Sequence, residues 1–240
     1  MFVAQELRKK SIAEYLLYMW QIEDIIRAYG CSLPVIKKNY VDRFDFTPEQ
    51  REEELDWFGN LIRMMNEEGK REGGHLNINK VILKDVIDLH GMLLQSTKFP
   101  IYNAEYYKVL PFIVELRQRG DKDLNEIETC LDALYGVMML RLQKKEITPE
   151  TERAIKEITV FIGLLSDYYN TSFEDRDTRK DIVAKYVPLY DGGNRLLYHL
   201  CIVIDNTDTV NIQNRIHDFE HIFSLVADFA KVGYGKYNFD

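Results

Sequence analysis

Apolar residues recur every three or four positions along most of the chain, which is the spacing of amphipathic helices. This periodicity predicts helices over residues 3–29, 33–42, 47–68, 77–95, 103–119, 123–144 and 148–169. Thr-Pro-Glu opens two of them, at Thr47 and Thr148, because threonine caps a helix and proline suits its first turn. Asn77 or Asn79 is the expected cap of another, and Pro111 is expected to bend a fourth. The predicted fold class is all-α, a bundle of about six helices.

The composition changes near residue 170, where the polar stretch "NTSFEDRDTRK" indicates a linker or a surface loop. Beyond it, the pattern predicts a short helix near 178–187 and an amphipathic helix near 210–232. The apolar run 195–204, within "RLLYHLCIVID", fits a buried strand or a helix, and we favour a helix because of its helical context. The chain therefore divides into a bundle domain, 1–172, and a helical C-terminal extension, 173–240, packed on it.

Composition and charge exclude several classes of protein. The 240 residues carry a net charge of -8, whereas a nucleic-acid-binding protein needs a basic face for phosphate contacts. The three cysteines lie far apart, which argues against a disulfide scaffold and a cysteine zinc site. The first residues lack the apolar centre of a signal peptide, and the longest apolar run is about half a membrane span. We expect a cytoplasmic protein with neither a nucleic-acid nor a membrane partner.

One charged residue interrupts the apolar stripe of the first predicted helix. Glu23 lies where an apolar residue is expected, and Arg27 follows one turn later on nearly the same face. The helix is apolar around most of its circumference, so we expect it to be central in the bundle and Glu23 to be buried. A buried carboxylate needs a partner. We predict a buried polar cluster of Glu23, Arg27 and, from the fifth long helix, Arg141.

Two interpretations of this cluster remain open. The first is a structural ion pair that fixes the register of the helices. The second is a charged pocket for a small anionic or polar ligand, lined by Trp20 and tyrosines together with Glu23, Arg27 and Arg141. The structural interpretation is favoured, because buried ion-pair networks without a ligand are common.

Two long segments carry a resemblance to a known family. "FVAQELRKKSIAEYLLYMWQIEDIIRA" and "NEIETCLDALYGVMMLRLQKKEITPE" resemble an uncharacterised family of Bacteroidetes proteins, a domain of unknown function. The resemblance covers roughly residues 1–172 and implies an all-helical, cytoplasmic bacterial protein. It implies no activity, cofactor or catalytic residue, and residues 173–240 depart from the family pattern.

The segment "HDFEH", residues 217–221, matches the H-x-x-E-H signature of inverted zinc peptidases. That fold needs a further glutamate ligand downstream, and the 19 residues after His221 contain none. A second metal hypothesis joins His217 and His221 to His90 or His199 in a three-histidine zinc site. The E-x-x-H match at Glu72 is weaker because it falls in a glycine-rich loop.

Helix geometry argues against these metal sites. The apolar stripe of the predicted helix 210–232 includes Ile212, Ile216 and Phe219, and at about 100° per residue the two histidines of "HDFEH" point away from it. His90 follows Leu89 in a predicted helix and suits the edge of the core with its hydrogen bonds satisfied.

The leading functional prediction is a non-enzymatic scaffold or interaction module that forms homo-oligomers through an aromatic-rich helix face, without a cofactor. The 15 tyrosines and 7 methionines support it, because both side chains adapt well to interfaces. The alternative is a small-molecule or metal-dependent enzyme that uses either Glu23 and Arg27 or the histidines His90, His217 and His221.

Overall fold

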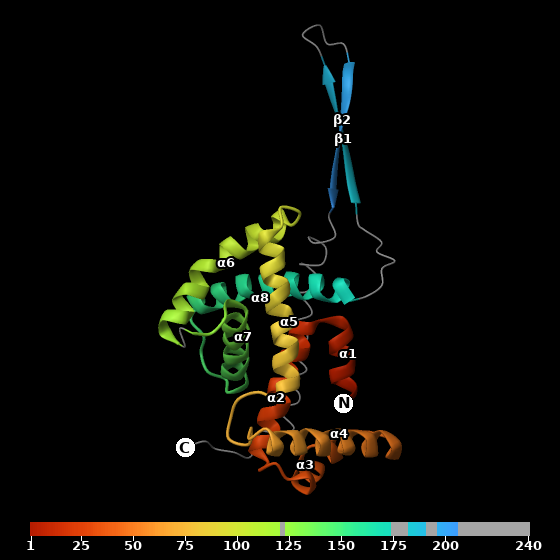
Figure 1. Ribbon diagram of the computed structural model, residues 1–240, viewed down its shortest axis with the longest axis vertical. Helices are drawn as coiled ribbons and strands as arrows, with labels where there is room; N and C mark the ends of the chain where they lie inside the picture. The colour runs from red at the N-terminus through yellow and green to blue at the C-terminus, as the bar shows by residue number, and fades with distance from the viewer. Residues whose placement is uncertain (121–122, 174–181, 191–195, 206–240) are drawn as a thin grey trace.

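The computed structural model describes residues 1–120, 123–173, 182–190 and 196–205, the last two ranges as backbone (Figure 1). Its helices are α1 (Phe2–Lys10), α2 (Ile12–Ala28), α3 (Leu33–Asn39), the 3-10 helix η1 (Val41–Arg43), α4 (Pro48–Glu67), α5 (Asn77–Gln95), α6 (Pro100–Arg119), α7 (Glu126–Leu142) and α8 (Pro149–Phe173). The all-α class is confirmed for this bundle. Within the described part, no helix combines the length and the apolar character that crossing a membrane requires.

The first predicted helix is two helices, because Ser11 interrupts it. Ser11 adopts an extended conformation with φ -156° and ψ 114°, and its hydroxyl accepts a hydrogen bond from the backbone N–H of Glu14. The same hydroxyl lies 3.0 Å from that of Ser166 in α8. A serine that caps the second helix competes with continuation of the first. Periodicity alone did not show this break, because the apolar spacing continues through it.

Helix α2 occupies the centre of the bundle, as expected from its apolar circumference. Leu16, Leu17 and Ile22 are 0%, 5% and 0% exposed, although they lie on different sides of the helix. The helix packs against α1, α5, α7 and α8. A polar side chain on α2 must therefore find its partners inside the protein, which sets the conditions at Glu23.

The predicted caps are confirmed in two places and wrong in a third. Thr47 and Gln50 form a reciprocal capping box at the start of α4, and the Thr148 hydroxyl accepts the N–H of Thr151 in the first turn of α8. Helix α5 follows Leu76 and has no cap from its own side chains, contrary to the expected Asn77 or Asn79. Helix α6 begins earlier than predicted and continues through its internal proline.

The described part of the C-terminal extension contains strands where helices were expected. Strand β1 (Ile182–Tyr190) pairs antiparallel with β2 (Leu196–Asp205), with Ile182 opposite Asp205 and Tyr190 opposite Leu196. Figure 1 shows this hairpin extending away from the helices. The helices predicted at 178–187 and 195–204 are thus wrong where the chain is described. The helix predicted at 210–232 lies outside the described residues.

Candidate functional site

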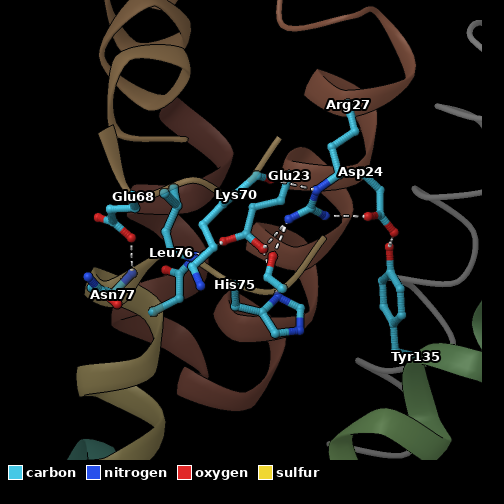
Figure 2. Close-up of polar contacts among 11 residues, drawn as sticks. Glu23, Asp24, Arg27, Glu68, Lys70, His75, Leu76, Asn77 and Tyr135 are labelled. Atoms are coloured by element: carbon cyan, nitrogen blue, oxygen red, sulfur yellow. Dashed lines mark hydrogen bonds and ion pairs between the residues drawn. The ribbon is translucent and has the colours of Figure 1, made fainter. Parts of the chain in front are cut away.

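Glu23 is the centre of a polar network that joins α2 to the α4–α5 loop (68–76), as Figure 2 shows. Its side chain is 0% exposed. One carboxylate oxygen accepts hydrogen bonds from the Leu76 backbone N–H at 3.0 Å and from the Asn79 amide at 2.7 Å. The other lies 2.7 Å from Nδ1 of His75 and 3.8 Å from the guanidinium of Arg27. The predicted burial of Glu23 and its pairing with Arg27 are confirmed.

These contacts show that Glu23 caps a helix to which it does not belong. The first N–H groups of a helix have no partner within it, and the helix dipole favours a negative charge there. Glu23 from α2 accepts the N–H of Leu76, and Glu68 at the end of α4 accepts that of Asn77 at 2.7 Å. At the start of α5, two carboxylates therefore accept the N–H hydrogen bonds that the asparagine side chains were expected to accept.

Arg27 holds the α4–α5 loop against α2. Its Nε donates to the Lys70 carbonyl at 3.1 Å, and one of its terminal nitrogens donates to the Gly74 carbonyl. The other terminal nitrogen binds Asp24 at 2.7 Å. Gly74 has a φ of 76°, in the left-handed region that favours glycine. The guanidinium thus donates to backbone and carboxylate acceptors of the protein itself. These bonds give Arg27 a structural role.

Aromatic rings cover the network on its α7 side. The Trp20 ring, 2% exposed, stacks on His75 with centroids 4.3 Å apart and 19° between the planes. Tyr135 from α7 meets Trp20 edge-on at 5.9 Å and donates its hydroxyl hydrogen to Asp24 at 2.6 Å. Burial raises the pKa of Asp132, helped by the charge of Glu128 and opposed by His75. The network therefore connects α2, the loop, α5 and α7.

A family model for a domain of unknown function, DUF4924, matches residues 1–176. This chain belongs to the DUF4924 family. No curated protein and no solved structure matches it. The match confirms the resemblance to a domain of unknown function over the helical bundle, and it leaves most of the C-terminal extension uncovered. The whole polar network lies inside the DUF4924 domain.

The structure separates Arg141 from the cluster in which it was expected. Arg141 lies in the last turn of α7, and its guanidinium binds Glu152 of α8 at 2.6 Å. In the described part of the chain, the partners of Glu23 are Arg27, His75, Leu76 and Asn79. The expected three-residue cluster is wrong on this point: the helical period placed Arg141 in the apolar stripe of α7, and that stripe does not determine whether its side chain reaches Glu23.

His90 occupies a second buried polar site of the DUF4924 domain, between α5, α6, α7 and α8. Its Nδ1 lies 2.6 Å from the Tyr102 hydroxyl, and its Nε2 lies 3.6 Å from the carboxylate of Glu126. Tyr106 donates to the same carboxylate at 3.0 Å, and Phe161 meets the imidazole edge-on. Burial lowers the pKa of His90 more than the nearby charge of Glu126 raises it. Its predicted role as a core-edge histidine with satisfied hydrogen bonds is confirmed.

The metal hypotheses receive no further support here. His199 belongs to β2, whose side chains are not described, and His217 and His221 lie outside the described residues. Among the residues that are described, no three His, Cys, Asp or Glu side chains gather in a way that would hold a metal ion.

Sequence reasoning missed three partners of Glu23: His75, Leu76 and Asn79. All three lie more than 50 residues away along the chain, in or just after a loop. No local signal identified them, because Asn77 and Asn79 offered this helix start caps of its own. The lone glutamate in an apolar stripe indicated only that Glu23 needs partners.

Proposed function

We propose that this protein is a non-enzymatic scaffold or interaction module that associates with a second copy of itself through the outer face of α6. The supporting observation is a seam of exposed apolar side chains, Ala104, Tyr107, Pro111 and Val114. Tyr107 is 66% exposed and Val114 is 47% exposed. Exposed apolar surface of this kind is typical of binding surfaces when it is continuous rather than scattered.

The spacing of the seam favours a helical partner. Successive members lie three, four and three positions apart, which is the a and d spacing with which two helices interlock. Six of the seven large apolar side chains that are exposed in the described part belong to α5 or α6. On α5, however, the charges of Asp85 and Asp88 interrupt the outward stripe between Val81 and Met92. The α6 seam has no such interruption, so it is the better contact surface.

The spacing of the seam also allows an antiparallel second copy. In a pair centred on residue 109, Ala104 lies opposite Val114 and Tyr107 lies opposite Pro111 of the second copy, so the seam covers itself. The helix dipoles also oppose each other in that arrangement, whereas a parallel pair would place like ends together. A contact made by one helix face is small, so we expect a weak dimer whose population rises with concentration.

The polar network of Glu23 supports this proposal indirectly. Its carboxylate and the Arg27 guanidinium both have internal partners, and these contacts position the α4–α5 loop. Such a role needs no substrate. The network therefore supports a structural function better than the enzymatic alternative.

Sedimentation velocity over a wide range of concentrations tests the proposal. The wild type should shift from monomer to dimer as concentration rises. The double variant Tyr107→Glu, Val114→Glu should remain monomeric, because it places charges in the seam. The matched control is Val81→Glu, Met92→Glu on the outer face of α5, which should dimerise like the wild type. A wild type that stays monomeric throughout, or a control as defective as the seam variant, would overturn the proposal.

A further inference from the structure

We infer that His75 fills a binding slot formed by Trp20 and Glu23, and that the slot takes a small planar nitrogen cation when the α4–α5 loop moves His75 out. A group with an imidazolium- or guanidinium-like plane is the chemical class that fits. This inference is independent of self-association through α6.

The first step is the position of the His75 ring. It stacks on the Trp20 indole at 4.3 Å while its Nδ1 lies 2.7 Å from the Glu23 carboxylate. A flat N–H donor that stacks on tryptophan and binds a carboxylate is how a planar cation is recognised. The chain thus supplies, from its own loop, a group with the shape and chemistry of such a ligand.

The second step is that the His75 ring is partly exposed, whereas the two groups it contacts are buried. The His75 side chain is 28% exposed, whereas Trp20 is 2% and the Glu23 side chain 0% exposed. Removal of this one ring would uncover an aromatic face and a carboxylate together. The carboxylate oxygen that contacts His75 would keep only Arg27, at 3.8 Å, and a buried oxygen without a close donor is costly, which creates a driving force for a replacement donor.

The third step is that the loop can release His75 by turning at two glycines. Gly73 and Gly74 directly precede it, and a Cβ built at Gly73 would meet nothing within 4 Å. The restraint next to this hinge is the bond from Arg27 to the Gly74 carbonyl. Trp20 and Glu23 both belong to α2, so they would keep their places while the loop moves.

The fourth step is the charge of the surroundings, which favours a donor. Asn79 is 1% exposed and directs its amide N–H to Glu23, but its carbonyl oxygen is buried without a donor. The carboxylate fixes this amide orientation, because a flipped amide would set oxygen against oxygen. Asp24 and Asp132 add acidic groups nearby. The carboxylates of Glu23, Asp24 and Asp132 outnumber the one guanidinium, that of Arg27, that contacts them, which suits a cation and disfavours an anion.

The experiment uses imidazole as the probe, below about pH 6.5 so that it is a cation. The background is Trp57→Phe, which leaves Trp20 as the one tryptophan to report binding. In His75→Ala, imidazole should quench Trp20 fluorescence saturably and raise the Tm. Methylguanidinium should act likewise, whereas methylammonium and acetate, which lack a stacking cationic plane, should not. His75→Ala, Trp20→Leu, followed by Tm alone, should lose the effect.

The wild-type chain decides whether the slot opens naturally. Imidazole should bind it roughly tenfold or more weakly than it binds His75→Ala, because the closed loop reduces the competent fraction. Binding should also speed tryptic cleavage at Lys70 and Arg71 in the loop. Saturable binding to His75→Ala with none to the wild type would show that His75 never leaves the slot, and it would overturn the inference. The same response with and without Trp20 would also overturn it. If His75→Ala does not fold, the wild-type titration and cleavage decide alone.

Discussion

Two buried polar groups contact helix α5, and they are stabilised in opposite ways. At its N-terminal end, the carboxylate of Glu23 collects N–H donors from His75, Leu76 and Asn79. Toward its other end, burial lowers the pKa of His90, and the imidazole lies against the hydroxyl of Tyr102. One contact buries an acceptor and surrounds it with donors, whereas the other buries a group that is favoured in its neutral form.

The difference between these two groups shows where a small helical core can hold a charged side chain. A helix start provides unpaired N–H groups, so a carboxylate there replaces lost water with fixed donors. The middle of a helix provides none, because its N–H groups are already bonded within the helix. A buried group such as His90 must then find side-chain partners, and the neutral form costs less to bury.

Removal of Glu23 is the strongest test of this comparison. Glu23→Leu should lower the free energy of unfolding by about 3–5 kcal/mol, because it leaves several buried donors and the Arg27 charge without their acceptor. Urea denaturation followed by circular dichroism measures the loss. The control is Glu52→Leu on the exposed face of α4, which should change stability by less than about 0.5 kcal/mol. Equal losses in the two variants would contradict the capping role.

Tyr102→Phe tests the neutral contact and should have a smaller effect. It removes only a hydroxyl, but the hydroxyl is the partner of a buried imidazole nitrogen. An unsatisfied buried polar group costs roughly 1–3 kcal/mol, so we expect a loss of unfolding free energy in that range. Tyr107→Phe, on the exposed side of the same helix, is the matched control and should be close to neutral. A neutral result at Tyr102 would mean that His90 finds another partner.

The sequence predicted the elements near the site better than the contacts within it. The burial of Glu23 followed from one charge in an apolar stripe, and its pairing with Arg27 followed from helical spacing. The donors His75 and Asn79 could not be predicted, because nothing local determines which loop meets which helix. Arg141 was misplaced for the same reason.

The strands of the C-terminal extension show a second limit. The run 195–204 is apolar and ends in β-branched residues, so its pattern allowed either element, and the helical neighbours favoured the wrong one. Its strand conformation comes with pairing to β1, in which Val183 lies opposite Ile204 and Val187 lies opposite Leu200. Such pairing is a long-range property that local periodicity does not contain.

The third prediction separates the two ends of α5 by pH. The lowered pKa of folded His90 means that, below the unfolded value of about 6.5, the unfolded chain binds a proton more readily than the folded chain. This contribution to stability is complete above that pH and is lost progressively as the pH falls from there toward the folded pKa. Urea midpoints between neutral and mildly acidic pH should fall in the wild type. The fall should be smaller in His90→Gln, whose amide can still accept from Tyr102. Identical slopes would exclude His90 as a source of the acid sensitivity.

The smallest expected effect concerns the hydrogen bond between α7 and α2. The test is again a change of tyrosine to phenylalanine, as at Tyr102. Tyr135 donates its hydroxyl hydrogen to Asp24, whose side chain is 43% exposed, so water can replace the lost donor. Tyr135→Phe should therefore cost only about 0.5–1 kcal/mol, in contrast to Tyr102→Phe. A double-mutant cycle with Asp24→Ala, by urea denaturation, isolates this bond from the ring contact with Trp20. A coupling energy as large as the effect of Tyr102→Phe would mean that the Glu23 network depends on α7 as strongly as on its own helix cap. The contrast between a buried and a water-accessible partner would then not explain the two sites.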